Sequence, residues 1–210
     1  MHGLTAALGR HVGDRAGAFS RLWRQKQLEY TFRRALMGRN RNFDVCTHDA
    51  LAHACEVFSL SLDCDQEADL LAGYLELPAF PDVREALISL QQDGTRLFAF
   101  SNGTSAAVSG LLERAGVRHC FVDVVSCDEV KSFKPDLVVY RHFLRRAGAA
   151  AETTWLISSN CFDCLGATSA GMRAAWLQRA RDNAPDRWEI EPTVTIDGLA
   201  VLAEMLPVQG

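Results

Sequence analysis

The stretch that decides the fold is LFAFSNGT, residues 97–104. Leu97 to Phe100 is apolar at every position, and such a run predicts a strand buried on both faces, as in a parallel sheet. Residues 101–104 then bring a hydroxyl, an amide and a glycine turn directly before a predicted helix. A helix start presents unpaired N–H groups and a partial positive charge. We therefore expect an anion site here, with simple capping of the helix as the alternative.

Similar units of strand and helix follow along the chain. Short apolar runs between amphipathic segments predict buried strands at residues 121–125, 155–157, 174–177 and 194–196. Apolar residues at helical spacing predict helices at residues 83–92, 108–115, 137–147, 165–170 and 199–206, with Gly116 and Gly148 closing two of them. Repeated β–α units predict an α/β protein with a parallel sheet and helices on both faces. In such sheets the functional groups lie at the carboxyl ends of the strands.

The residues before Pro78 have a different pattern. From about residue 18 to residue 76 there are few β-branched residues and no alternating strands, so this region is predicted to be wholly helical. Pro78 and Pro81 then interrupt the helical pattern. We therefore expect a mainly helical region over residues 1–77 and an α/β region over residues 78–210.

The composition is that of a globular protein. Of the 210 residues, 48% are hydrophobic and 23% are charged, and the net charge is −4. A nucleic-acid binder would usually carry a basic surface, so no nucleic-acid partner is expected. The longest apolar runs are a few residues, whereas a membrane span needs about 20. Neither a membrane segment nor a secretory signal at Met1 is expected.

The cysteines argue against a disulfide framework, because there are seven of them and the chain is not small. This usage predicts a reducing, cytoplasmic location. Cys161 and Cys164 form a C-x-x-C sequence. A redox pair is one interpretation, and small residues at the start of a helix are the simpler one. A zinc site would need a second ligand pair, which the sequence lacks at suitable spacing, so no metal is expected.

Two further strand ends carry polar groups. In residues 131–136, KSFKPD, Pro135 is expected to hold Lys134 extended and to occupy the first position of the next helix. A lysine fixed there can neutralise a carboxylate or a developing negative charge, although a solvated lysine is the alternative. Residues 158–163, SSNCFD, bring hydroxyls, an amide and a carboxylate. Asp163 could complement the helix dipole, order a water molecule or hold Lys134.

Taken together, these three strand ends resemble the haloacid dehalogenase superfamily. The resemblance rests on Ser101-Asn102-Gly103, on Phe133-Lys134-Pro135 with Tyr140, and on Ser158-Ser159-Asn160 with Asp163. The helical stretch LWRQKQLEYT, residues 22–31, is similar to the signature helix of the L-2-haloacid dehalogenases of type II.

This resemblance implies a fold and a reaction. The core would be a Rossmann-like parallel sheet, and residues 1–77 would form a helical cap. The reaction would remove halide from C2 of a short (S)-2-haloacid by hydrolysis and give the (R)-2-hydroxy acid. An aspartate would attack C2 and form an ester, which water then hydrolyses. The resemblance implies no metal and no cofactor, and a homodimer formed through the cap.

The roles of individual residues also follow from the resemblance. Arg24 matches the residue that accepts the halide or the substrate carboxylate, for which a permanently charged guanidinium is suited. Lys134 matches the lysine that neutralises the nucleophile. The implied catalytic residues are Arg24, Ser101, Lys134, Tyr140, Ser158, Asn160 and Asp163, and the implied substrate-binding residues are Arg24, Leu28, Phe43, Ser101, Asn102 and Phe162. Phe162 departs from the family, where tryptophan is usual.

One part of the family pattern is not found in the printed sequence. The nucleophilic aspartate lies in a strand and loop resembling D-x-Y-G-T-L-F-D, which the resemblance places just before Met1. We therefore expect that aspartate and the first strand of the sheet upstream of residue 1. Little or no turnover is expected from the chain as printed, together with an apolar slot beside the strand at 97–100.

Two explanations stay open. In the first, the sequence starts too late within an ordinary dehalogenase. In the second, the chain is a truncated, catalytically inactive homologue that only binds small carboxylates. A phosphatase of the same superfamily is less favoured, because the Arg24 helix indicates haloacids.

Overall fold

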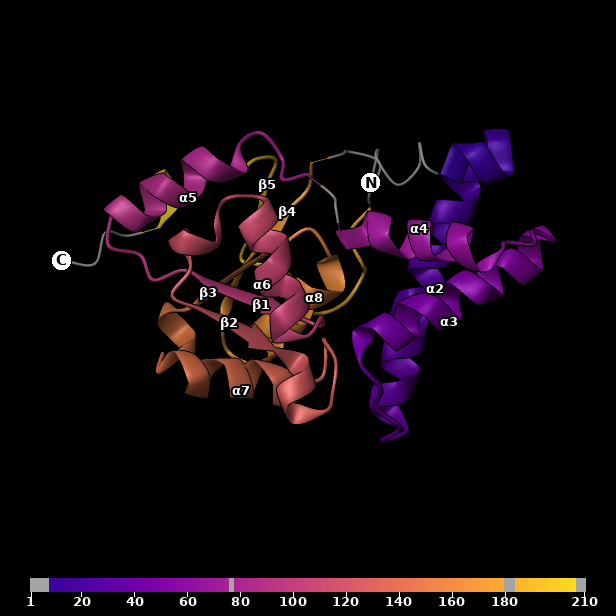
Figure 1. Ribbon diagram of the computed structural model, residues 1–210. Coiled ribbons are helices and arrows are strands. Elements are labelled where there is room, and N and C mark those ends of the chain that lie inside the picture. The colour runs from indigo at the N-terminus through magenta and orange to yellow at the C-terminus, as the bar shows by residue number, and fades with distance from the viewer. Residues whose placement is uncertain (1–7, 76–77, 180–183, 207–210) are drawn as a thin grey trace.

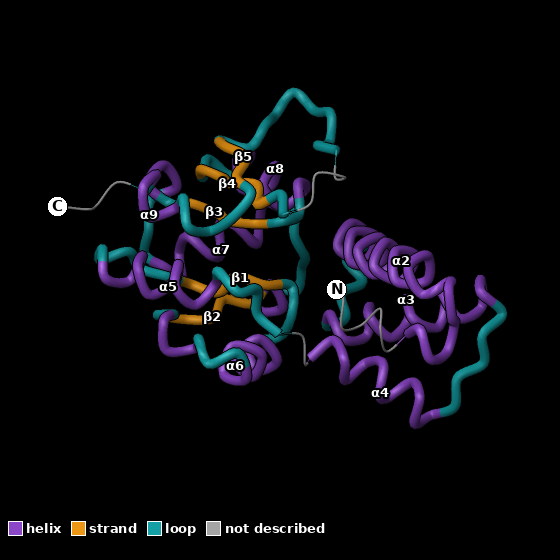
Figure 2. The backbone as a smooth tube through the Cα atoms, turned by 90° about the horizontal axis from the view of Figure 1, so that it is seen from above, coloured by secondary structure: helices purple, strands orange, loops and turns teal. Residues whose placement is uncertain are grey.

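The computed structural model describes residues 8–75, 78–179 and 184–206. A helical part and an α/β part lie side by side (Figures 1 and 2). The helical part consists of residues 8–12, a 3-10 turn η1 (Gly13–Arg15) and the helices α2 (Ala16–Leu36), α3 (Phe43–Phe58) and α4 (Cys64–Leu75). The wholly helical pattern predicted for this region is confirmed.

The helical part has a core of its own. Residues spaced by four along α2 share one face of that helix. Of these, Phe19 and Trp23 are fully buried against Ala50, Leu51 and Ala54 of α3. Asn42 caps the start of α3, because its side-chain oxygen accepts a hydrogen bond from the Val45 N–H at 3.2 Å.

The α/β part contains five parallel strands and five helices among the described residues. The strands are β1 (Phe98–Ser101), β2 (Asp123–Ser126), β3 (Trp155–Ser158), β4 (Arg173–Leu177) and β5 (Val194–Ile196). The helices are α5 (Val83–Gln92), α6 (Ser105–Arg114), α7 (Leu137–Ala147), α8 (Cys161–Ser169) and α9 (Leu202–Met205). Short 3-10 turns are η2 (Arg118–Cys120), η3 (Cys127–Val130) and η4 (Ala151–Thr153).

Helices cover both faces of the strands, as predicted. Side chains alternate between the two faces of a strand. In β4, Ala174 and Trp176 pack in the cluster that contains α7 and α8, whereas Ala175 and Leu177 pack in the cluster that contains α5 and α9. The α/β class is therefore confirmed.

The strands form two hydrogen-bonded sheets within the described residues. β1 pairs with β2, with Phe98 opposite Asp123. β4 lies between β3 and β5, with Leu156 of β3 opposite Ala174. No described strand joins β1 to β3, so the strands lie in two sheets within the described residues.

The prediction that the strand beginning near Leu97 is buried on both faces is wrong. All four residues of β1 are only half-buried, whereas Val124 and Val125 of the neighbouring β2 are buried. The physical reason is that β1 has a described strand partner on one edge only.

Several boundaries also differ from the sequence predictions. Pro135 does not occupy the first position of α7. Asp136 caps this helix, because its carboxylate accepts from the Val138 N–H at 3.0 Å. The Lys134–Pro135 peptide bond is cis. The helix predicted at 165–170 begins four residues earlier, at Cys161. The strand predicted at 121–125 begins at Asp123, since η2 precedes it and Val122 is exposed. The last helix is shorter than predicted.

No helix in the described parts of the chain has the length and apolar character that crossing a membrane requires.

Candidate active site

A buried lysine joins the two sheets at the carboxyl end of β1. Lys134 is 6% exposed. Its ammonium Nζ donates to the main-chain oxygen of Phe100 at 3.0 Å and to Asp163 Oδ2 at 2.9 Å. The same nitrogen lies 3.9 Å from the centroid of the Phe100 ring. Phe100 belongs to β1, and Asp163 lies in the first turn of α8, after β3, so this one side chain connects the ends of both strands.

Both carboxylate oxygens of Asp163 have donors. Oδ2 accepts from Lys134, and Oδ1 accepts from the Tyr140 hydroxyl at 2.7 Å. Burial raises the pKa of Tyr140 far above its ordinary value, and the charge of Asp163 raises it further. The phenol therefore stays protonated and remains a donor. The Asp163 carboxylate is thus fixed by Lys134 and Tyr140, which leaves it poorly placed to attack a substrate.

Gly166 makes this contact sterically possible. A Cβ atom at Gly166 would lie 2.4 Å from the Tyr140 hydroxyl oxygen and 2.7 Å from Cζ of the same ring. Tyr140 is fully buried and its ring is rigid, so it has little room to move away. A glycine on α8 is therefore required for Tyr140 to reach Asp163.

The Gly166→Ala variant is expected to lose about 1–3 kcal/mol of unfolding free energy, the usual cost of overpacking a core. Gly110→Ala in α6 is the matched control, because its new Cβ would meet only the flexible end of Arg114 at 3.4 Å. It is expected to be neutral or to gain up to about 1 kcal/mol. Urea unfolding of both variants measures this, and equal stability of the two would contradict the role given to Gly166.

Ser101 and Asn102 lie at the end of β1 but do not cap α6. Thr104 caps it, accepting from the Ala107 N–H at 3.3 Å. Asn102 Oδ1 accepts from the Lys134 N–H at 2.9 Å, and Ser101 Oγ accepts from the Gly103 N–H at 3.1 Å. Asn102 therefore ties the lysine loop to the end of β1.

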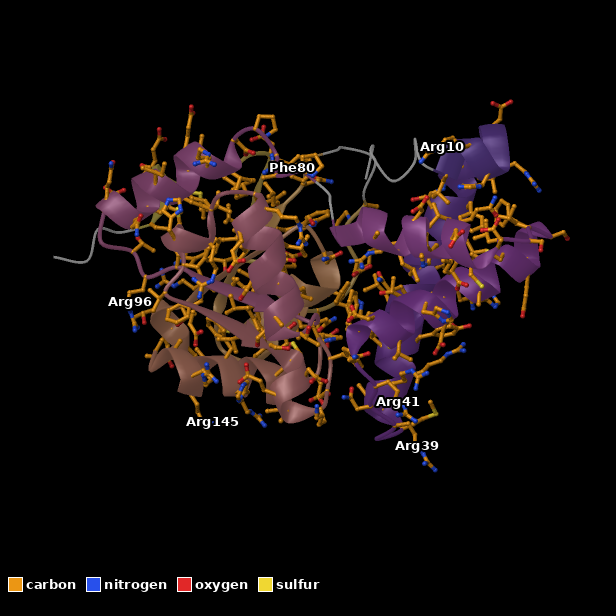
Figure 3. All side chains as sticks on the ribbon, in the orientation of Figure 1. Arg10, Arg39, Arg41, Phe80, Arg96 and Arg145 are labelled. Carbon is orange, nitrogen blue, oxygen red and sulfur yellow. The ribbon has the colours of Figure 1, made fainter. Side chains whose placement is uncertain are left out.

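Arg24 reaches the α/β part from helix α2. Its Nη2 lies 3.5 Å from Asn160 Oδ1, at the end of β3, and its Nη1 donates to Gln27 Oε1 at 2.5 Å. Nearby, the rings of Phe32 and Phe162 pack edge to face with centroids 5.2 Å apart. By contrast, the labelled Arg10, Arg39, Arg41, Arg96 and Arg145 project from the periphery of the molecule (Figure 3).

A cavity of about 300 Å³ lies beside Asn160, between the helical and α/β parts. It brings together three of the residues implied by the resemblance, Leu28, Asn160 and Phe162. Its other lining residues are Ser159, Cys161, Trp176, Ala184 and Asp186. Phe43 is not among the described lining residues, and neither are Ser101, Lys134, Tyr140 and Ser158. Ser158 Oγ instead accepts from the Asn160 N–H at 3.2 Å.

Some residues of this region could not be recognised as parts of a site from the sequence. Gly166 looks like an ordinary helical glycine, and Trp176 and Asp186 are distant from the motifs in sequence. Gln27 has one usable signal: it lies four residues after Trp23, on the buried face of α2.

The C-x-x-C cysteines lie at the start of α8. Cys161 begins the helix and is half-buried, whereas Cys164 is fully buried. Burial raises the pKa of Cys164 to about 12, so its thiol is protonated at neutral pH. All seven cysteines are free, and no group of three or more candidate metal ligands is found among the described residues.

The arrangement of parallel strands and helices is shared with proteins of known structure. The model of the haloacid dehalogenase-like hydrolases matches residues 2–171, and the chain belongs to this family.

The individual proteins that this chain resembles belong to one group of these hydrolases. An (S)-2-haloacid dehalogenase of Pseudomonas putida is 34% identical over 206 residues, which cover 98% of this chain and 90% of that protein. The crystal structure of the L-2-haloacid dehalogenase RSc1362 superposes with a TM-score of 0.94 at 29% identity, covering 98% of this chain and 92% of that one. The L-2-haloacid dehalogenase of Xanthobacter autotrophicus with chloropropionic acid covalently bound has a TM-score of 0.87 at 28% identity, covering 96% and 91%. The homologues are thus haloacid dehalogenases.

Proposed function

We propose that this protein hydrolyses short (S)-2-haloacids to (R)-2-hydroxy acids and halide through an aspartyl ester. The observation that carries the proposal is the buried Lys134, which Asp163 holds at the end of β1. Asp163 lies on the same β3–α8 segment as Asn160, which Arg24 contacts. An ammonium fixed there stabilises a second carboxylate and the charge that develops as halide leaves. The covalent chloropropionic acid in the Xanthobacter autotrophicus relative supports an ester intermediate.

The residues take distinct roles in this proposal. Arg24 receives the halide or the substrate carboxylate, and Ser101 and Asn102 contact the substrate at the end of β1. Lys134 neutralises the attacking carboxylate. Tyr140 holds Asp163, which with Ser158 and Asn160 positions the hydrolytic water. The walls of the apolar pocket are formed by Leu28, Phe43 and Phe162.

We propose that the attacking carboxylate lies in a segment preceding residue 1. Asp163 is already engaged by Lys134 and Tyr140, and residues 1–7, MHGLTAA, contain no Asp or Glu. β1 and β3 each have an edge without a described strand partner, and a parallel strand between them would end beside Lys134. These two observations support a nucleophile carried by that strand.

The wider organisation follows from the same proposal. Residues 1–77 act as a cap and residues 78–210 as the core that holds the catalytic lysine. Two copies associate through the cap, where Leu36 and Met37 at the end of α2 are exposed apolar residues. The seven free cysteines are consistent with a reducing cytoplasm. We propose no cofactor.

A second candidate function is an inactive homologue that binds small carboxylates. It is favoured by the fact that Arg24, Asn160 and the adjacent cavity are all contributed by described residues. In this case the chain would bind a haloacid without forming the ester.

Anion binding by the chain as printed tests the role of Arg24. We expect (S)-lactate, a substrate analogue with a hydroxyl in place of the halogen, to bind with a Kd near 1 mM, which corresponds to about −4 kcal/mol. Arg24→Ala should abolish this binding in isothermal titration calorimetry. Unchanged affinity in a folded Arg24→Ala variant would contradict the proposed role.

A further inference from the structure

Gln27 is a fully buried polar side chain that touches the site arginine. Its Oε1 accepts from Arg24 Nη1 at 2.5 Å, and its Nε2 donates to Thr47 Oγ1 at 2.6 Å. Gln27 is 0% exposed, and Thr47, on α3, is 7% exposed. The side chain therefore connects the guanidinium to the neighbouring helix through the interior of the helical part.

The orientation of the Gln27 amide is fixed by the groups beyond it. The Thr47 hydroxyl donates its single proton to the main-chain oxygen of Phe43 at 2.9 Å, so its oxygen faces Gln27 as an acceptor. Only the NH₂ group of Gln27 can donate to it, which leaves the amide oxygen for Arg24. The indole N–H of Trp23 donates to the main-chain oxygen of Thr47 at 2.9 Å and anchors this part of α3.

We infer that Gln27 is a positioning residue that aims Arg24 at the anion site. The guanidinium is planar, so fixing Nη1 on Gln27 restricts where Nη2 can lie. Nη2 is the nitrogen near Asn160, which lines the cavity. This inference rests on the anion-binding role of Arg24 in the proposed function.

The choice of an amide has a physical reason. A carboxylate at position 27 would hold the guanidinium more strongly, because a charge-assisted hydrogen bond is stronger than a neutral one. It would also add a negative charge beside Arg24 and weaken its attraction for an anion. The amide of Gln27 supplies the same acceptor geometry and adds no negative charge.

Two substitutions separate positioning from charge. Gln27→Met keeps the size of the side chain and removes both hydrogen bonds. Gln27→Glu keeps the shape, but the ionised form adds a charge and cannot donate to Thr47. When protonated, Glu has a hydroxyl that can donate to Thr47 and a carbonyl that can accept from Arg24, so the effect of this substitution should fade as the pH falls.

The experiment is calorimetric titration of the full chain with (S)-lactate at pH 8 and pH 5, with folding checked by circular dichroism. Gln27→Met is expected to weaken binding about tenfold, or about 1.4 kcal/mol. At pH 8, Gln27→Glu should weaken it at least tenfold more than Gln27→Met, and the excess should shrink at pH 5. Gln92→Glu on the exposed surface of α5 is the control for net charge and should bind as the unaltered chain does.

The outcomes are distinguishable. Two results overturn the inference: wild-type affinity in folded Gln27→Met, or binding by Gln27→Glu at pH 8 that is no weaker than binding by Gln27→Met. Arg24→Ala tests the role of Arg24 separately. Absence of binding by the unaltered chain, or full binding by Arg24→Ala, overturns the inference together with the anion-binding role proposed for Arg24. If the Gln27 variants do not fold, Thr47→Val takes their place, because it removes the hydroxyl that Gln27 Nε2 contacts. Thr47→Val should weaken binding severalfold, and wild-type affinity in the folded variant would overturn the inference.

Discussion

Replacing Lys134 by methionine is expected to lower the free energy of unfolding by about 3–5 kcal/mol, because it leaves Asp163 charged, buried and without its ionic partner. The side chains of Lys134 and Asp163 are 8% and 6% exposed, and their charged atoms lie 2.9 Å apart. The Phe100 main-chain oxygen also loses its contact with the ammonium. Urea unfolding followed by circular dichroism measures the change.

Lys131→Met is the matched control. Lys131 pairs with Asp128 at the same distance of 2.9 Å, but its side chain is 69% exposed. An exposed pair contributes at most about 1 kcal/mol, so this variant should be nearly as stable as the unaltered chain. Adding Asp163→Asn to Lys134→Met should recover part of the lost stability, since it removes the uncompensated charge. Equal, small losses in both lysine variants would show that Lys134 is an ordinary solvated lysine.

The same lysine should matter for catalysis. In a chain that carries the proposed nucleophile, Lys134→Ala is expected to slow halide release about 100-fold or more, because one electrostatic group of this kind contributes about 3 kcal/mol.

The sequence predicts the elements that depend on local pattern. Helix α7 and strand β3 are predicted to within one residue, since apolar spacing and Gly148 specify them locally. The half-exposure of β1 could not be predicted, because the burial of a strand depends on what pairs with its edges. The separate expectation that Pro135 occupies the first position of this helix is wrong, because the Asp136 side chain caps α7 and Pro135 lies before it.

The candidate site is predictable in part. The rule that functional groups gather at strand ends places Lys134 and Asp163 at one edge. It cannot show that Tyr140 reaches Asp163 only because residue 166 is a glycine. The spacing of Gln27 from Trp23 indicates a buried position, but the two hydrogen bonds that orient its side chain could not be predicted.

Joining a strand segment with the D-x-Y-G-T-L-F-D pattern to residue 1 is expected to produce the largest effect of all. The segment would pair with the edges of β1 and β3 that have no described strand partner, and it would bring its first aspartate next to Lys134. Enzymes accelerate their reactions by about a million-fold or more, so turnover should rise from background to a readily measured rate. Replacing that aspartate by asparagine should abolish turnover, whereas Asp65→Asn on the exposed surface of α4 should retain it.

The most direct test is halide release from (S)-2-chloropropionate by three folded chains: the chain as printed, the extended chain, and the extended chain with asparagine in place of the added aspartate. We predict release by the extended chain alone, with (R)-lactate as the organic product. Enzymatic release by the chain as printed would contradict the assignment of the nucleophile to the preceding strand. An inert, correctly folded extended chain would contradict the proposed dehalogenase function itself.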